Sequence, residues 1–153
     1  MIIKCVENTG KFIRQYEDIP LKLDQTGKFG VTEEFMYWFE IGEEFFVTGM
    51  VLSENKLLYL IDTPFRDGLS SIGLYPYQLF KVIDHRLPPK GWCFNTYALK
   101  DAAHPYTQAI WGYQEWCFDL HNEHYEGLVE MDEYAQSIYH KRKNELQDSL
   151  SIS

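Results

Sequence analysis

The strongest constraint on the fold of this chain comes from two apolar segments and the short polar stretch between them. Residues 45–52 and 56–62 are rich in Val, Phe, Tyr, Leu and Ile, which is typical of β-strands. Ser53, Glu54 and Asn55 separate them, and asparagine tolerates the left-handed backbone conformation that a tight turn requires. The pattern predicts an antiparallel hairpin, and therefore a sheet in the first half of the chain.

Further short apolar segments, bounded by glycine, proline and polar residues, predict more strands around this hairpin. We expect them at residues 2–6, 35–40, 72–75 and 79–83, with a turn at Pro64, Asp67 and Gly68. Closely spaced strands joined by hairpin turns are typical of a small barrel or curled antiparallel sheet. Residues 35–39 and 57–61 are apolar or aromatic throughout, so both faces of those strands need cover.

The second half of the chain is predicted to supply that cover. Residues 87–91, Leu-Pro-Pro-Lys-Gly, favour an extended path that ends in a turn, and we interpret them as a hinge between layers. Residues 92–99 predict one more strand, and from about residue 115 the apolar spacing is helical, with Asp132 as the N-cap of the last helix. We expect one α+β domain over 1–153, with a β-rich barrel layer at 1–86, a Pro-rich hinge at 87–91, and a mixed strand and helical layer at 92–153.

The net charge of −9 is concentrated in one part of the chain. Residues 91–140 contain eight acidic residues and one basic residue, Lys100, whereas residues 1–90 contain 13 acidic and 10 basic residues. Such an acidic block repels phosphate backbones and attracts cationic partners, so direct nucleic-acid binding is disfavoured. No apolar segment approaches the ~20 residues that span a bilayer, and the first residues lack the pattern of a signal peptide. We expect a cytoplasmic protein without membrane association, with Cys5, Cys93 and Cys117 as reduced thiols.

Patterns for catalysis or metal binding are weak throughout. Gly27 and Gly30 lack the spacing of a phosphate-binding loop. His121 and His124 lie three positions apart, but the His-Glu-x-x-His arrangement of a zinc site is absent. We expect no catalytic residue, no metal ion and no cofactor. The alternative is a small cytosolic enzyme or ligand-binding domain whose pocket, between barrel and helices, gathers His85, His121, His124 and Cys93.

The clearest functional candidate is a row of acidic residues. Glu115, Asp119, Glu123, Glu126 and Glu130 are four, four, three and four positions apart, so in a helix they would share one face. Trp116, Leu120 and Leu128 would then face the core. Like charges at this spacing cost about 0.2–0.5 kcal/mol per pair, and a site built for a cationic partner would tolerate that cost.

Aromatic residues lie beside the acidic row. Trp111, Tyr113 and Trp116 precede or overlap it in sequence, and aromatic anchors surrounded by charge are common in protein interfaces. We therefore predict a surface for a basic protein partner, formed by the five acidic residues and these aromatic residues. The alternative is a solvated acidic face that residues 141–143 neutralise, with Gly127 interrupting the helix.

Several segments together carry a resemblance to a known group of proteins. They are the turn Thr9-Gly10-Lys11, the apolar segments 45–47 and 58–61, the stretch 84–92, and residues 110–113. In these segments the chain resembles small bacterial proteins that begin with a Src-homology-3-like barrel and are similar to immunity proteins of toxin–immunity systems. The resemblance implies a protein that binds and neutralises a cognate toxin domain, often a basic nuclease, and it carries no catalytic motif.

Overall fold

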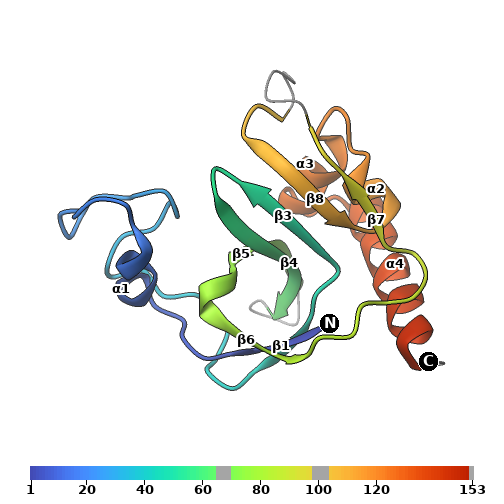
Figure 1. Cartoon of the computed structure of the whole chain (residues 1–153), viewed down its shortest axis with the longest axis horizontal. Coiled ribbons are helices and arrows are strands. Elements are labelled where there is room, and N and C mark those ends of the chain that lie inside the picture. The colour runs from blue at the N-terminus through green and yellow to red at the C-terminus, as the bar shows by residue number, and fades with distance from the viewer. Residues whose placement is uncertain (65–69, 98–103, 152–153) are drawn as a thin grey trace.

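The computed structural model describes residues 1–64, 70–97 and 104–151 (Figure 1). Its strands are β1 (Ile2–Cys5), β2 (Glu44–Phe46), β3 (Gly49–Ser53), β4 (Lys56–Pro64), β5 (Ser70–Pro76), β6 (Phe80–Asp84), β7 (Cys93–Asn95) and β8 (Thr107–Gly112). Its helices are α1 (Gly10–Ile13), α2 (Gln114–Cys117), α3 (Glu123–Val129) and α4 (Glu133–Ser151), with 3-10 turns at Arg14–Tyr16 and Tyr77–Leu79. Antiparallel strands followed by C-terminal helices confirm the predicted α+β class.

The described strands form two antiparallel sheets, one in the order β2-β1-β6 and the other in the order β5-β4-β3-β8-β7. Val47 and Thr48 connect β2 to β3, so the chain passes between the sheets within the segment that the sequence predicts as one strand. The N–H and the hydroxyl of Thr48 both donate to the carbonyl of Leu60, at 3.1 and 3.0 Å, which fixes this crossing. Over the described residues the sheets do not close into a barrel.

The predicted hairpin is confirmed. β3 and β4 pair in antiparallel register from Gly49↔Leu60 to Ser53↔Lys56. Glu54 and Asn55 make the turn with positive φ angles of 48° and 61°, the left-handed conformation that a two-residue hairpin turn needs.

The five-stranded sheet lies between two hydrophobic cores. Leu60 and Ile110 face the helices, where they share a core with residues of α2, α3 and α4. Tyr59 and Ile61 face the opposite side, since neighbouring side chains of a strand alternate, and pack with residues of β1, β2 and β6. Residues 59–61 are thus buried on both sides, as their apolar pattern predicts.

Residues 35–40 form no strand, contrary to the prediction. They make one isolated bridge, between Thr9 and Met36, and no described strand pairs with them further. Only one side of the segment is covered, contrary to the expectation of cover on both faces, because Tyr37 and Phe39 are buried while Met36 and Trp38 are exposed. The segment serves the core through its aromatic rings: Phe39 packs against Phe45, Tyr75 and Phe80.

Strand β8 is present where the sequence predicts none, in the interior of the sheet between β3 and β7. β7 occupies part of the predicted strand 92–99, whose last two residues lie outside the described residues, as do Asp67 and Gly68 of the predicted turn. Residues 87–91 connect β6 to β7 without regular structure. Asp132 begins the last helix as predicted, because its carboxylate accepts a hydrogen bond from the Ala135 N–H at 2.8 Å.

Candidate protein-binding surface

The segment that carries the predicted acidic row is two short helices, α2 and α3, separated by a turn. Asp119 sets the start of α3, because its carboxylate accepts hydrogen bonds from the N–H groups of His124 at 3.1 Å and Tyr125 at 2.9 Å. The single acidic face of a continuous helix is therefore not formed. A continuous helix would also place Leu120 in the core, but its side chain is 57% exposed.

Glu115 is held by the C-terminal helix. The Arg142 guanidinium donates from Nε to Oε2 of Glu115 at 2.9 Å and from Nη2 to Oε1 of Glu115 at 2.5 Å. These bonds keep the pKa of Glu115 below its usual range. Arg142 also pairs with Glu145, and the next residue, Lys143, pairs with Asp62. Helix α4 thus neutralises Glu115, as the alternative of a solvated, compensated face expects for this residue.

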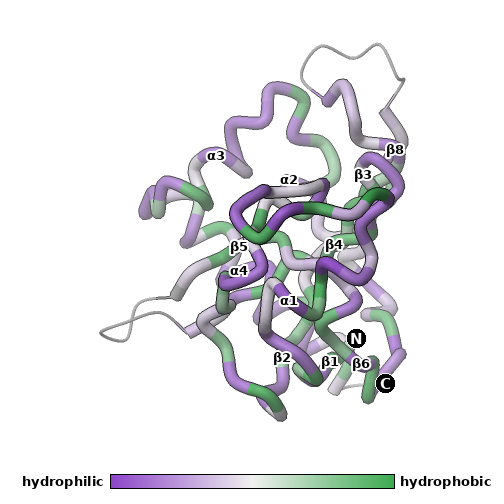
Figure 2. Tube along the Cα trace, turned by 90° about the vertical axis from the view of Figure 1, so that its left-hand side faces the viewer, coloured by the Kyte–Doolittle hydropathy of each residue, from purple (hydrophilic) through white to green (hydrophobic). Residues whose placement is uncertain are grey.

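Glu123, Glu126 and Glu130 remain as an exposed acidic row along one side of α3. Within the described ranges, no lysine, arginine or histidine forms an ion pair with any of them. Large apolar side chains are exposed on α3, on the turns before and after it, and in the first turn of α4. These are Phe118, Leu120, Val129, Met131 and Tyr134. We call the three glutamates and these five residues the α3 surface, and Figure 2 shows α3 at the periphery of the molecule.

Two of the three predicted aromatic anchors are core residues. Tyr113 is 1% exposed and Trp116 is 4% exposed. The Tyr113 hydroxyl bonds with Nε2 of His124 at 2.7 Å, and burial raises the pKa of this tyrosine. Trp116 packs edge-to-face on Tyr125 and against Gly49. Both residues support the α2–α3 segment from beneath and do not line its surface.

Trp111, the third predicted anchor, lies on the opposite side of the sheet. Its neighbour Ile110 faces the helices, and successive side chains of a strand point to opposite faces. The ring of Trp111 packs against that of Phe94, with 5.4 Å between centroids, and Phe94 is exposed. The structure therefore separates Trp111 from the acidic residues that follow it in sequence.

The structure brings together only part of the groups of the enzyme hypothesis. Cys93 and Tyr113 line a cavity of about 240 Å³ beside α4, and His124 bonds with the Tyr113 hydroxyl, whereas His85 and His121 are exposed. Burial raises the pKa of the Cys117 thiol to about 12 and so keeps it protonated at neutral pH. In the part of the chain that the structure describes, no group of three or more His, Cys, Asp or Glu residues is placed to hold a metal ion.

Sequence reasoning missed the apolar members of the α3 surface. The sequence pattern predicts Leu120 in the core and does not place Val129, Met131 or Tyr134 on a surface. The signal was present as apolar residues interleaved with Glu126, Glu130 and Glu133. It could not be interpreted without knowing where α3 begins and ends.

Searches against protein-family models, curated proteins and solved structures gave no match. The similarity to immunity proteins with a Src-homology-3-like barrel therefore stays a prediction. Among the described helices, none has the length and apolarity needed to cross a membrane.

Proposed function

We propose that this protein is a non-catalytic, cytoplasmic protein-binding module of the immunity type, which binds a basic toxin domain through the α3 surface and neutralises it. The proposal rests on one observation. Glu123, Glu126 and Glu130 form an exposed acidic row without an ion pair to any described residue, and large apolar side chains are exposed within the same stretch of chain, residues 118–134.

The acidic row carries a cost that a cationic partner would remove. Glu123 and Glu126 are three positions apart, and Glu126 and Glu130 are four apart. Each such like-charge pair destabilises a helix by about 0.2–0.5 kcal/mol. Positive charge on a partner would turn this repulsion into attraction and would speed association.

The apolar part of the α3 surface supports a protein as the partner. Single exposed apolar side chains are common, but a group of them surrounded by charged residues is typical of interaction sites. Phe118 and Tyr134 provide aromatic area of the kind that interfaces bury at their centre. A small anionic or neutral ligand would gain no charge attraction from the glutamates and would be too small to cover the exposed apolar side chains.

The finer fold assignment belongs to the same proposal. The two sheets, joined through Val47 and Thr48, would be an open variant of the Src-homology-3-like barrel that the sequence resembles. The antiparallel order of the strands is compatible with this assignment, and a solved structure of a related immunity protein with the same strand order would test it.

Charge reversal on α3 tests the proposed function. The wild-type chain and a Glu123→Lys, Glu126→Lys variant are used as bait in the native cell extract, and the captured basic protein is then purified and titrated at rising salt. Neutralisation is measured as inhibition of that protein's toxicity or nuclease activity. We expect association to slow as salt rises and the variant to bind at least about tenfold more weakly.

A matched variant distinguishes an effect of the α3 glutamates on binding from an effect of the net charge of the protein. Glu34→Lys with Glu40→Lys changes the net charge equally at exposed residues far from α3 in sequence and leaves every ion pair of the described residues intact. Glu115 is unsuitable for this purpose because its loss frees Arg142. Equal binding by the wild type and the α3 variant, or equal loss in both variants, would contradict the proposal.

A further inference from the structure

A cavity of about 240 Å³ lies between the five-stranded sheet and the α2–α3 segment, next to the α3 surface. Leu58 and Leu74 contribute apolar side chains from β4 and β5, and Trp116, Asp119 and Tyr125 contribute from the helical side. Tyr106 stands at the cavity and is 63% exposed. Cavities of about 150 Å³ already hold a benzene-sized group, so this one has room for a guanidinium and its methylene stem.

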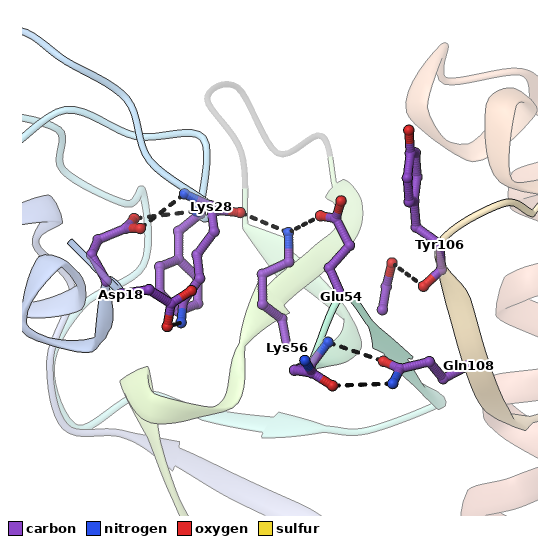
Figure 3. Close-up of polar contacts among 10 residues, drawn as sticks. Asp18, Lys28, Glu54, Lys56, Tyr106 and Gln108 are labelled. Carbon is purple, nitrogen blue, oxygen red and sulfur yellow. Dashed lines mark hydrogen bonds and ion pairs between the residues drawn. The ribbon is translucent and has the colours of Figure 1, made fainter. Parts of the chain in front are cut away.

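Three aromatic residues, Tyr106, Trp116 and Tyr125, line this cavity. Trp116 and Tyr125 pack edge-to-face, with 5.6 Å between ring centroids. The backbone of Tyr106 is fixed because its carbonyl accepts hydrogen bonds from Ser53 Oγ at 3.2 Å and from the Glu54 N–H at 3.1 Å. Figure 3 shows the Tyr106 ring pointing away from Gln108, toward the helical part of the molecule. The faces of such rings attract cations.

The β3–β4 turn stiffens the segment that carries Tyr106. Gln108 Oε1 accepts from the Asn55 N–H at 3.0 Å, and Gln108 Nε2 donates to Asn55 Oδ1 at 3.1 Å (Figure 3). Because the backbone of Tyr106 is already fixed, only the freedom of its side chain is lost when a ligand binds, and a smaller ordering cost of this kind favours binding.

Asp119 also lines the cavity and is an acidic residue. Each of its oxygens accepts one backbone hydrogen bond, from His124 or from Tyr125. A carboxylate offers about four acceptor sites, so acceptor capacity remains on both oxygens. Over residues 1–64, 70–97 and 104–151, no lysine or arginine pairs with Asp119.

We propose that this cavity accepts an arginine side chain of the basic protein partner. The inference rests on the proposed function and names where that partner inserts a side chain. A guanidinium can stack on a tyrosine ring and bind both oxygens of a carboxylate, while its methylene stem packs on Leu58 and Leu74. No neutral side chain makes all three contacts, and the negative charge of Asp119 favours a cation.

A small arginine probe tests the cavity without the partner. The full-length, isotope-labelled chain is titrated with Nα-acetyl-arginine methylamide at physiological ionic strength, and amide shifts are followed by NMR. We expect saturable shifts at Tyr106, Asn122 and Tyr125, and binding of the citrulline analogue about tenfold weaker or absent, because citrulline has the shape of arginine without its charge. Equal binding of both probes, or shifts confined to the glutamates of α3, would overturn the inference.

Variants with matched controls assign the contacts. Asp119→Asn should weaken arginine binding about tenfold or more, and Tyr106→Ala about two- to fivefold. Asp132→Asn changes the other helix-capping aspartate, and Tyr77→Ala removes an exposed tyrosine outside the cavity, so both should bind the probe like wild type. Asp119→Asn keeps an oxygen that can cap α3. If Asp119→Asn nevertheless unfolds, Tyr106→Ala still tests whether arginine binds in the cavity. Wild-type probe binding by Tyr106→Ala and by a folded Asp119→Asn would overturn the inference.

The two proposals fail separately. If arginine does not enter the cavity but the partner complex still depends on Glu123 and Glu126, the cavity proposal is wrong and the proposed function stands. If arginine enters the cavity and no basic partner depends on α3, the cavity binds a cation but the proposed function is wrong.

Discussion

Arg142 in α4 and Glu115 in α2 form a bidentate ion pair, with Nε–Oε2 at 2.9 Å and Nη2–Oε1 at 2.5 Å. The residues are 27 positions apart, and both side chains are about one-third exposed. The pair fastens the last helix to the short helix that follows the sheet. It also removes one of the five predicted binding acids from the surface available to a cationic partner.

Breaking this pair should destabilise the fold modestly. Because both side chains contact solvent, we expect Glu115→Gln to lower the free energy of unfolding by about 1 kcal/mol in urea titrations. The pKa of Glu115 is depressed in the folded state, so this stability is present above the unfolded pKa of about 4.3 and is lost as pH falls through the folded value. Glu145→Gln, which leaves the bidentate pair intact, should cost less. Equal stability of Glu115→Gln and wild type at neutral pH would contradict the expected role.

The contact between Trp116 and Gly49 predicts a larger loss. A Cβ at position 49 would lie 2.8 Å from Cδ1 and Nε1 of the indole, so the ring has to move. We expect Gly49→Ala to lower the free energy of unfolding by about 1–3 kcal/mol, measured by urea denaturation. At Gly42, where φ is +94° and nothing lies within 4 Å of an added Cβ, alanine should cost only about 1 kcal/mol of backbone strain. If Gly49→Ala lowers the free energy of unfolding less than Gly42→Ala does, the Trp116 ring can move aside at little cost and the prediction is wrong.

His124 predicts a pH dependence of stability. Burial lowers its pKa in the folded state, and the neighbouring charges of Asp119 and Glu115 only partly oppose this. Because the folded pKa lies below the unfolded value of about 6.5, the unfolded chain binds the proton more readily. The corresponding stability is present above pH ~6.5 and declines as pH falls below it. Unfolding free energies between about pH 8 and pH 5 should decline less steeply in His124→Gln than in wild type. His121→Gln, at an exposed histidine, should retain the wild-type slope.

Local patterns predicted those parts of the fold that local chemistry determines. The β3–β4 hairpin follows from Asn55 and two β-rich segments, and the start of α4 follows from the capping carboxylate of Asp132. The division of residues 115–130 was not predictable in the same way. Asp119 can lie on a helix face or cap the next helix, and the choice depends on how Trp116 and Leu128 reach the core.

Long-range partners decided the remaining differences. The apolar and aromatic residues of segment 35–40 are typical of a strand, but only the fold shows that no described strand lies beside them. The sequence does not predict β8, because six residues with two large apolar side chains, Ile110 and Trp111, do not establish a periodic pattern, and its neighbours β3 and β7 are distant in sequence. Of the predicted binding residues, Glu123, Glu126 and Glu130 share an exposed face. Tyr113 and Trp116 are core residues. The sequence could not show this, because an aromatic residue can serve equally as an interface anchor or as a core side chain.

Arg14 organises the irregular N-terminal connection and provides the last prediction. Its guanidinium donates to the carbonyls of Leu23 and Gln25, at 3.2 and 3.3 Å, to the carbonyl of Lys22, and to the Glu33 carboxylate at 3.4 Å, while its side chain is 8% exposed. Residues 20–28 form no helix or strand. The hydrogen bonds to Arg14 hold several of their carbonyls around one fixed charge and are therefore a main restraint on this backbone. Losing a hydrogen bond to a charged group costs about 1.5 kcal/mol or more, so Arg14→Ala should raise the rate of tryptic cleavage after Lys22 and Lys28 by about tenfold or more. Arg86→Ala removes an exposed arginine that pairs with Asp84 and should leave this cleavage unchanged. If the two variants are cut at the same rate, the connection is held by its other contacts, such as the bonds of the Glu17 carboxylate to the N–H groups of Lys28 and Phe29.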